Sequence, residues 1–573
     1  MGLEYGDVRN KEAVKHSAIP GQGRLPDRPL NTSPNSTARR NFIWGLVYFS
    51  VAAAVIVQGQ SRSGIFNAEF GHFPDEPAHA MTAIFFRDYF AALFPSPLAF
   101  AHNYYLHYPK IAIGIWPPVF YVLAGTWLLI FGTSHVSFLA FMTTMGAALG
   151  TTLSLFVRRV AGPWLGLASG ILLLCLRPLR FGTTTMMVDT TLTLMCLLAT
   201  LALIRYFRTE RLPDALTFGL LTALAMLTKG NAIELLLLAP LMVIVLGRYR
   251  LLLKKDLYVA GAVVALIGLP WQFLSIYMLK NAALIGSSAT PGMLVKGRGY
   301  LGILFEQSGP VAAMAAIVFV IARIRRARVP FEIEIAGAGC LVMAVYIFHV
   351  VAPVPGPDGR YMMGALPALI FLFVAGVSLA ARALGRRRSW IIYAAAALLL
   401  FAMPADSWIV TKHDRIGLAD AARIVRGSPA RVILVDADAT SEGAFVLNLA
   451  LLDHRPDHIV IRSTKLMSDN PWDSSIYRPR VNSPEEVKTI LDAVPVDVVV
   501  LDLTRPGWEQ DSALLLRALR SDSANWILTD DIPVSPAASH HLEIFQNVRP
   551  HNRSATDAQL SAIVESLLSK PRK

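Results

Sequence analysis

The chain has 573 residues and a formal net charge of +13, with 54% hydrophobic and only 16% charged residues. Soluble domains carry about 25% charged residues, so this composition excludes an ordinary soluble protein. The positive charge does not indicate nucleic-acid binding, because residues 405–573 hold 19 Lys and Arg against 23 Asp and Glu. The excess therefore lies beside the apolar stretches, as in the cytoplasmic loops of membrane proteins.

The first segment, residues 1–41, is polar and contains Pro, Ser and Asn. This composition predicts a disordered, cytoplasmic N-terminus. It also places the first apolar stretch too far along the chain for a usual cleaved signal peptide. Cys175, Cys196 and Cys340 all lie within apolar stretches, where we expect small buried side chains rather than disulfides or zinc ligands.

Residues 42–404 consist of successive apolar stretches with short polar breaks. Most stretches are about long enough to cross a hydrocarbon core of about 30 Å as a helix. We therefore predict an α-helical polytopic membrane protein with about eleven spanning helices. The predicted spans are Phe42–Gln58, Val136–Val157, Pro163–Leu176, Thr190–Phe207, Ala215–Thr228, Ala232–Leu246, Leu257–Met278, Gln307–Ala322, Ile333–Val351, Met362–Ala381 and Trp390–Met403.

Clusters of arginine and lysine fix the expected orientation of these spans. If the spans alternate in direction, every cluster falls on the same side, which the positive-inside bias identifies as cytoplasmic. The N-terminus is then inside and the tail from Ala405 outside. The clusters occupy residues 39–40, 158–159, 205–211, 248–255, 323–328 and 386–388.

One further apolar stretch, Trp116–Phe131, would disturb this alternation if it crossed the membrane. Its tryptophan and tyrosine side chains suit the membrane interface. We therefore predict a juxtamembrane helix that lies in or dips into the outer leaflet, with a full crossing as the alternative.

The tail, residues 405–573, reads as a soluble α/β domain outside the membrane. RVILVDAD, HIVIRS and DVVVLDL are buried-strand patterns separated by helical stretches, which predicts a partly parallel sheet. The tail has no GxGxxG motif and no evident catalytic constellation. We expect it to act as a lid or as an acceptor-binding domain.

The first predicted outer loop, Ser61–Ile115, carries an acidic pair, Asp75 and Glu76. A carboxylate pair near the membrane surface can provide a general base together with a metal or substrate ligand. The alternative is an acidic turn that caps the helix beginning near Pro77. His79 lies three residues beyond Glu76, and an ordinary interface histidine is its simpler interpretation.

The same loop continues with HNYYLHYPK, which includes Tyr105, His107 and Lys110. Tyrosine can stack on a sugar, and the lysine can pair with a lipid phosphate. Snorkelling of these side chains to the headgroups is the alternative.

Asp189 stands at the predicted outer end of a span and has no charged partner within one helical turn. Ionisable groups at membrane depth are costly and usually functional. A helix cap at the interface is the alternative.

Three cations and a tyrosine are predicted on the same side as Asp189. Lys229 lies in a tight break between two spans, where charge compensation with Glu234 is the alternative role. Arg180, Arg360 and Tyr361 add further polar groups, with headgroup anchoring as the alternative for the arginines. Together with the carboxylates they predict an outward cavity suited to a phosphate-bearing lipid.

The motifs, in their order, resemble the membrane glycosyltransferases of the GT-C superfamily, closest to the aminoarabinose–lipid A transferases and protein O-mannosyltransferases. The resemblance covers about residues 42–381 and leaves the tail uncovered. It rests on Asp75–Glu76 after the first span, WPP at Trp116–Pro118, Asp189, LTKG at Leu227–Gly230, and RYxxxxLP from Arg360 to Pro367.

This resemblance implies transfer of a sugar, with inversion, from a polyprenyl-phosphate donor to a lipid, glycan or protein acceptor at the outer face of the cell (inner) membrane. It implies Asp75 as the general base and Lys229 or Arg360 as ligands of the donor phosphate. Such enzymes often carry Glu-Lys-Pro in the first loop, where the glutamate can bind a metal. Here the stretch is HYPK, with His107 and Lys110, so a divalent metal is left open.

The residues leave two other functions open. A transporter or flippase for a lipid-linked glycan needs polar groups near the membrane midplane, and the inner halves of the predicted spans carry few of them. A non-catalytic anchor that presents the tail is the third possibility.

Overall fold

The computed structural model describes residues 34–281, 291–325, 330–352, 356–385, 387–469, 477–503, 510–534, 541–549 and 556–568. Of the segment predicted to be disordered, residues 1–41, residues 1–33 lie outside the described residues, whereas residues 34–41 are helical and begin α1 (Pro34–Ser63). The chain divides into two compact units, Met1–Ile43 and Trp44–Lys573. The helices, strands and contacts from residue 44 onward belong to the second unit.

Each predicted span is occupied by a helix or by a pair of consecutive helices. These are α1 (Pro34–Ser63), α5 (His135–Ala161), α6 (Pro163–Cys175), α8 (Asp189–Thr209), α9 (Leu212–Met226), α10 (Leu238–Leu246), α11 (Lys255–Ile267) with α12 (Leu269–Asn281), α14 (Pro310–Arg325), α15 (Glu332–Val351), α16 (Leu366–Leu384) and α17 (Ser389–Phe401). The chain is thus a mostly helical, multi-pass membrane protein.

Fewer of these helices reach full spanning length than the eleven predicted. In the described part of the chain, six are long and apolar enough to cross a membrane. The number rises to eight if two bent pairs each count as one span: α6 with α7 (Arg177–Thr184), bent by 68°, and α13 (Met293–Ser308) with α14, bent by 108°. The other three, α9, α10 and α17, have 15, 9 and 13 residues.

Local sequence explains where the helices begin and end, as α5 illustrates. The Ser134 side chain accepts a hydrogen bond from the Ser137 N–H and caps the first turn. Arg158 and Arg159 lie in the last turn, where cations complement the helix dipole. Gly162 then adopts φ 90°, and Pro163 opens α6.

Contacts between helix ends gather the basic clusters on one side of the bundle. Arg208, in the last turn of α8, pairs with Glu334 in the first turn of α15. Arg382, in the last turn of α16, donates to the carbonyl oxygen of Val160 near the end of α5 (2.6 Å). These contacts place the basic ends of α5, α8 and α16 together, in agreement with the predicted alternation.

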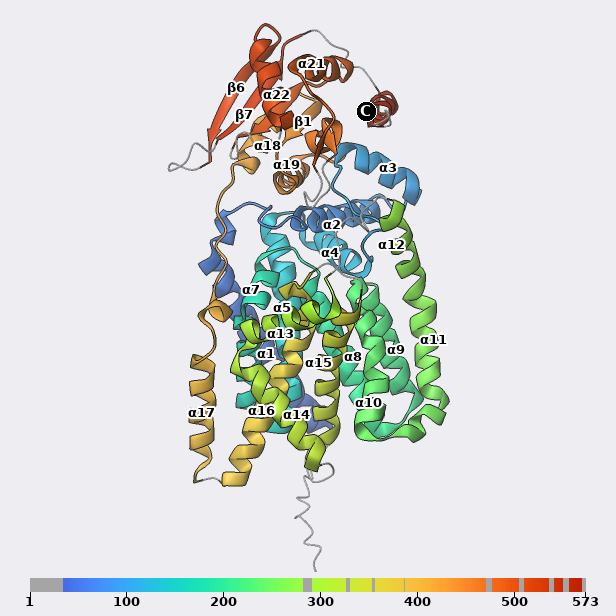
Figure 1. Ribbon diagram of the computed structural model, residues 1–573, viewed down its shortest axis with the longest axis vertical. Coiled ribbons are helices and arrows are strands. Elements are labelled where there is room, and N and C mark those ends of the chain that lie inside the picture. The colour runs from blue at the N-terminus through green and yellow to red at the C-terminus, as the bar shows by residue number, and fades with distance from the viewer. Residues whose placement is uncertain are drawn as a thin grey trace, which may run out of the picture. The chain divides into compact units, whose positions relative to one another are not determined.

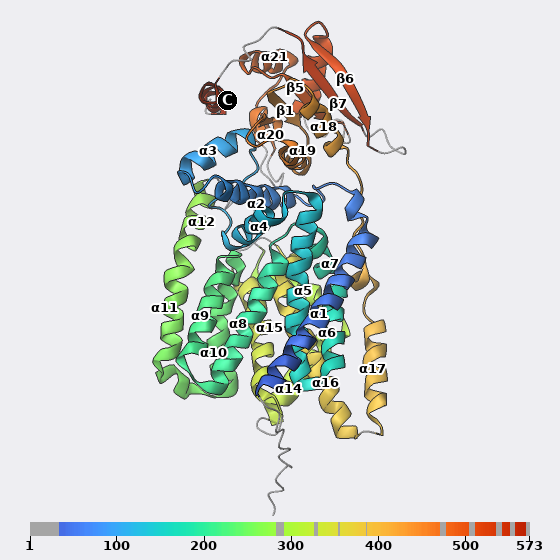
Figure 2. The ribbon, with the colours of Figure 1, turned by 180° about the vertical axis from the view of Figure 1, so that it is seen from behind.

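The first loop forms three helices, α2 (Glu76–Ala91), α3 (Pro97–His107) and α4 (Val119–Phe131). In both side views α2 runs across the ends of the bundle helices (Figure 1, Figure 2). With 13 residues, α4 is about 20 Å long, shorter than a hydrocarbon core. It packs closely on α2, since a Cβ on Gly125 would lie 2.8 Å from the Cβ of Phe86. This arrangement agrees with a juxtamembrane helix in the stretch Trp116–Phe131.

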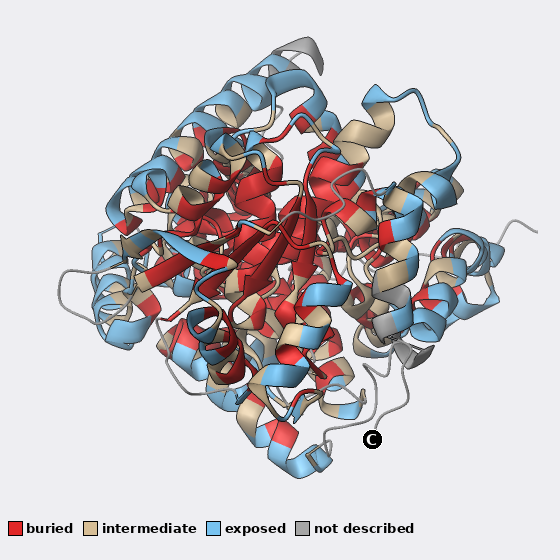
Figure 3. Cartoon of the chain, turned by 90° about the horizontal axis from the view of Figure 1, so that it is seen from above, coloured by how far each residue is buried: buried red, intermediate tan, exposed pale blue. Residues whose placement is uncertain are grey.

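The tail forms an α/β domain around a five-stranded sheet of order β2-β1-β5-β7-β6. The three predicted strand patterns become β1 (Val432–Asp436), β2 (Ile459–Arg462) and β5 (Val498–Asp502), which run parallel. The antiparallel strands β7 (His541–Asn547) and β6 (Trp526–Pro533) complete the sheet. Every residue of β1 is buried, and Figure 3 shows buried residues gathered at the centre of the view.

The remaining elements are shorter helices, strands and 3-10 segments. The domain contains α18 (Leu418–Gly427), α19 (Ala439–Leu452), α20 (Ser463–Leu466), α21 (Pro484–Ala493), α22 (Gln510–Ser521), α23 (Asp557–Leu568), β3 (Ser468–Asp469) and β4 (Arg478–Pro479). The 3-10 segments are η1 (Ile65–Asn67), η2 (Gly230–Leu237), η3 (Tyr249–Leu253), η5 (Gly359–Ala365) and η6 (Ala405–Trp408).

The domain is attached to the first loop on both sides of α2. Before α2, the carboxylate of Glu69 accepts hydrogen bonds from the N–H groups of Gly417 (2.9 Å) and Ala419 (2.7 Å), at the start of α18. At the far end of α2, Arg455 donates through Nε to Asp88 (2.7 Å). The helix that begins beside Asp75 is therefore fastened by the C-terminal domain at both ends.

Candidate active site

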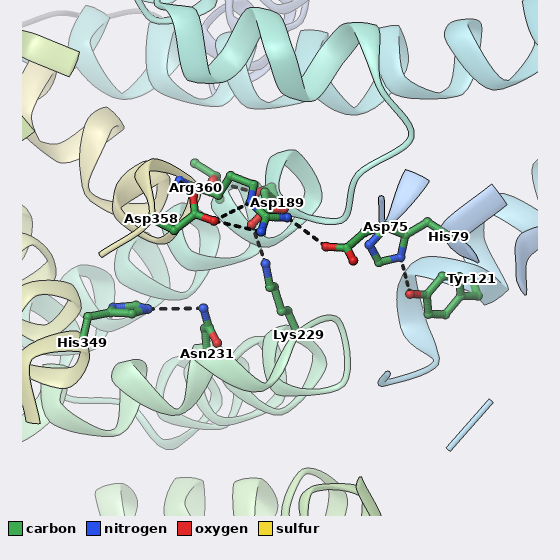
Figure 4. A network of polar contacts seen from close by, with 10 residues as sticks. Asp75, His79, Tyr121, Asp189, Lys229, Asn231, His349, Asp358 and Arg360 are labelled. Atoms are coloured by element: carbon green, nitrogen blue, oxygen red, sulfur yellow. Dashed lines mark hydrogen bonds and ion pairs between the residues drawn. The ribbon is translucent and has the colours of Figure 1, made fainter. Parts of the chain in front are cut away.

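Asp75 meets a residue that is distant in the sequence. It occupies the N-cap position of α2, but its side chain makes no capping hydrogen bond. Instead its Oδ2 accepts a hydrogen bond from Nη1 of Arg360 (3.1 Å), which lies 285 residues further along the chain (Figure 4). In this structure the side chain of Asp75 does not serve as a helix cap.

Arg360 is held in place by a second carboxylate, Asp358. Asp358 caps η5 by accepting the N–H of Arg360 (2.8 Å) through Oδ1, and its Oδ2 accepts from Nε (3.0 Å) and Nη2 (2.9 Å) of the same arginine. The guanidinium also lies over the ring of Phe73, 4.5 Å from its centroid. Asp358 was not predicted as a site residue, although an aspartate at the start of a helical stretch is a capping signal in the sequence.

Asp189 and Lys229 form the second ion pair of the site. Asp189 begins α8 and is 3% exposed, and its Oδ1 accepts from Nζ of Lys229 (2.7 Å). Its other oxygen, Oδ2, is buried and has no hydrogen-bond partner among the described residues. The ammonium of Lys229 lies 5.4 Å from the ring centroid of Tyr361. Lys229 therefore pairs with Asp189. The alternative role, charge compensation with Glu234, would have required an ion pair with Glu234 instead.

The two cations keep unused donors that a ligand can reach. A guanidinium has five N–H donors and an ammonium three; Arg360 uses three in the bonds above and Lys229 uses one. Their side chains are 17% and 21% exposed. The arrangement can thus bind an anion while Asp75 and Asp189 present carboxylate oxygens beside it (Figure 4).

Glu76, predicted as the partner carboxylate of Asp75, supports the loop instead. It is 1% exposed and accepts N–H groups from Gly71 (3.0 Å), His72 (3.2 Å) and Met186 (3.1 Å). Burial raises the pKa of Glu76 to about 7, against the effect of these donors. The bond to Met186 ties the first loop to the segment that leads into Asp189.

His79 has the interface role that was its simpler interpretation. Its Nδ1 is hydrogen-bonded to the Tyr121 hydroxyl (2.6 Å), and its ring lies 4.1 Å from that of Trp116. These contacts join α2 to the segment around α4.

Among the described residues, the HNYYLHYPK side chains form no hydrogen bond with the two ion pairs, and their roles in donor and substrate binding stay predictions. Lys110 is 9% exposed and donates to the carbonyl of Ala439 (2.9 Å) in the C-terminal domain. The Nε2 of His107 lies 3.6 Å from Asp557 in α23. Tyr105 is 51% exposed on α3. Lys110 and His107 therefore contact the C-terminal domain.

Arg180, a further candidate ligand of the donor phosphate, stays a prediction. It lies on α7 and donates to the carbonyl of Trp408 (2.5 Å), just before the C-terminal domain. Asp189 pairs with Lys229 rather than with Arg180.

In the described part of the chain, no group of possible metal ligands lies at the ion pairs. Among the described residues, the group of His, Cys, Asp and Glu side chains close enough to share an ion is Asp453, Asp457 and His458 in the C-terminal domain. There Asp453 already accepts from Tyr108 (2.8 Å) and contacts His458 (2.8 Å). A divalent metal in the function of the site stays a hypothesis.

Comparisons with known proteins agree with this architecture. The family model for dolichyl-phosphate-mannose-protein mannosyltransferase matches residues 116–273. The crystal structure of ArnT from Cupriavidus metallidurans in the apo state superposes with a TM-score of 0.54 at 14% identity, covering 90% of this chain and 100% of that one. The chain has the fold of the GT-C membrane glycosyltransferases. The resemblance inferred from the motifs is thereby confirmed, and the structural similarity extends into the tail that those motifs did not cover.

A second ArnT structure from the same organism, bound to undecaprenyl phosphate, matches with a TM-score of 0.55 at 15% identity, covering 89% of this chain and 99% of that one. No curated protein sequence matches this GT-C-like chain.

Proposed function

We propose that this protein is an inverting glycosyltransferase that moves a sugar from a polyprenyl-phosphate donor to an acceptor. The observation that carries the proposal is the convergence of Asp75, Asp189, Lys229 and Arg360 from four distant segments into two ion pairs. The family model names a dolichyl-phosphate sugar, and one similar structure contains undecaprenyl phosphate. Both support a lipid phosphate as the group that the cations bind.

The chemistry matches the residues at the site. A polyprenyl phosphate is a weak base when it leaves the anomeric carbon, so it needs charge stabilisation more than protonation. The remaining donors of Lys229 and Arg360 supply that stabilisation. An acceptor hydroxyl or amine must lose a proton as it attacks, and a single displacement of this kind inverts the anomeric centre.

Asp75 is our candidate for the general base. Arg360 donates to its Oδ2, whereas its Oδ1 forms no hydrogen bond or ion pair with the described residues and can receive the proton. Asp189 is the second carboxylate, and its unpaired Oδ2 can accept a hydrogen bond from a substrate. If Asp189 proves to be the base, the two roles exchange.

The orientation of the protein is part of the same proposal. The basic ends of α5, α8 and α16 lie together, and the positive-inside bias places such ends in the cytoplasm. Asp189, at the opposite end of α8 from Arg208, then faces the outer side of the cell (inner) membrane. The C-terminal domain, attached to the first loop, lies outside with it.

Lipid binding tests the proposal directly. Purified full-length protein should bind undecaprenyl phosphate more tightly than undecaprenol, which has the same chain without the phosphate. Lys229→Ala should weaken phosphate-lipid binding by about 1.5–3 kcal/mol, the size of a charge-assisted contact. Equal affinity of the unmodified protein for the two lipids would reject a donor-phosphate site in this cluster.

A further inference from the structure

A buried polar network lies next to Lys229, centred on His349 in the last turn of α15. His349 is 0% exposed, and its Nδ1 lies 2.9 Å from the carbonyl oxygen of Val345. Its Nε2 lies 3.3 Å from Nδ2 of Asn231 (Figure 4). Because a carbonyl only accepts and an amide nitrogen only donates, the neutral imidazole carries its proton on Nδ1 and accepts through Nε2.

Glu234 completes the network from the helix break that follows Lys229. It is 2% exposed, and its Oε2 lies 3.5 Å from Nδ1 of His349. Its other oxygen, Oε1, contacts the Cys196 thiol (3.8 Å). Burying an ionisable group inside a bundle of membrane helices costs free energy, and such groups usually mark functional sites. The network is therefore a candidate for a functional role.

His349 is connected to the candidate site through Tyr361. The two rings are stacked, with centroids 5.2 Å apart and planes 19° from parallel. The ammonium of Lys229 also lies beside the Tyr361 ring, 5.4 Å from its centroid. A lysine side chain loses up to about 2 kcal/mol of rotamer entropy when it is fixed. If the Tyr361 ring already holds the side chain in place, ligand binding no longer has to supply this free energy.

We propose that His349 is a positioning residue for donor binding, a role that rests on the proposed function. Its ring sets Tyr361, and thereby the ammonium of Lys229, in the place where the donor phosphate binds. The imidazole also lies beside Glu234, five residues from Lys229, whose Oε2 has no hydrogen-bond partner among the described residues. Without the ring in this place, Glu234 competes with Asp189 and the phosphate for the ammonium.

A double-mutant cycle with undecaprenyl phosphate tests this role in the full-length protein. His349→Ala should weaken binding about tenfold, the size of a coupling between contacting residues, and should leave undecaprenol binding unchanged. In a Lys229→Ala background the same substitution should have little further effect. His349→Gln keeps a polar group but has no ring to stack on Tyr361, so it should weaken undecaprenyl phosphate binding by a similar factor. It replaces the alanine variant in the cycle if that variant does not fold.

Cys340→Ala is the matched control, because Cys340 is equally buried in α15 but belongs to its apolar face. It should leave the ratio of the two lipid affinities unchanged. Equal losses from His349→Ala with and without Lys229, or equal losses for both lipids, would overturn the inference. If instead Lys229→Ala has no effect by itself, the proposed phosphate site fails, which is a different result.

Discussion

At the scale of single residues, Asp75 carries the central chemical prediction. Asp75→Asn keeps the shape of the side chain and removes its charge. General-base removal costs about 10²–10⁴-fold in rate, so kcat should fall by that range while undecaprenyl phosphate still binds. Turnover of the purified variant, measured beside its lipid affinity, checks both parts.

Asp492→Asn makes the same chemical change at a side chain that is 52% exposed in the C-terminal domain, and should leave kcat unchanged. Near-normal turnover of the Asp75 variant would remove Asp75 as the base. An inactive Asp189→Asn variant would then exchange the two roles.

Lys110 provides a pH-dependent prediction. Burial lowers its pKa to about 7, from an unfolded value near 10.5. Between these two pH values the unfolded chain binds a proton that the folded chain does not. The free energy of unfolding should therefore rise by a few kcal/mol as the pH increases from about 7 to about 10.5. Melting temperatures of the wild type and Lys110→Met across this range measure it: the variant should lose this rise. Identical pH dependence in both proteins would contradict the buried environment of Lys110.

The sequence predicted the candidate site residues but not which of them pair with each other. Residue type and position in the chain predicted Asp75, Asp189, Lys229 and Arg360 as candidates. Their pairing into Asp75–Arg360 and Asp189–Lys229 depends on contacts across 285 and 40 residues. Such contacts leave no local pattern, whereas Asp358 left a capping signal that can be recognised in retrospect.

At the scale of elements, the turn before α2 decides whether Asp75 and Glu76 reach their partners. Gly71 adopts φ +114°, and a Cβ there would lie 2.4 Å from the Cβ of Ala444 in α19. Its N–H also donates to Glu76 (3.0 Å). Only glycine combines this backbone conformation with so close a contact.

Gly71→Ala should therefore destabilise the protein by about 1–3 kcal/mol and reduce turnover together with it. Gly261→Ala in α11 is the matched control, because a Cβ there meets nothing within 4 Å, and alanine stabilises a helix by about 0.5–1 kcal/mol. Thermal unfolding in detergent compares the two variants. A Gly71→Ala protein as stable as the control would mean that the turn does not need its left-handed conformation.

Element by element, apolar length predicted the helices but not how they break. The pair α13 and α14 bends by 108° between Ser308 and Pro310, where the sequence suggested one span from Gln307. Proline can begin a helix as readily as it can kink one, and tertiary packing chooses between the two. The strand patterns of the tail were easier to recognise, because buried parallel strands appear as continuous apolar runs.

At the scale of the whole molecule, the C-terminal domain fastens the loop that carries Asp75. The Arg455–Asp88 pair at the end of α2 is 9% and 11% exposed, and Tyr104 also donates to Asp88 (2.9 Å). Loss of one member of a buried pair costs about 3–5 kcal/mol. Asp88→Asn and Arg455→Met should each lower the melting temperature, and the double variant should lose much less than their sum.

The Arg549–Asp492 pair, 31% and 52% exposed, is the control and should contribute about 0–1 kcal/mol. Additive losses at Asp88 and Arg455 would show that the two residues do not stabilise each other. The contacts of Lys110 and His107 with this domain could not be predicted from the sequence, because no local pattern specifies where the domain lies.

The most direct test of the whole account is the lipid content of a strain that lacks the gene. We predict that a polyprenyl-phosphate sugar accumulates in the deletion strain, is consumed when the wild-type gene is restored, and accumulates again when Asp75→Asn replaces it. Mass spectrometry of extracted lipids measures this and identifies the sugar. Lipid profiles that do not differ between the deletion and wild-type strains, or full consumption of the lipid by the Asp75→Asn protein, would contradict the account.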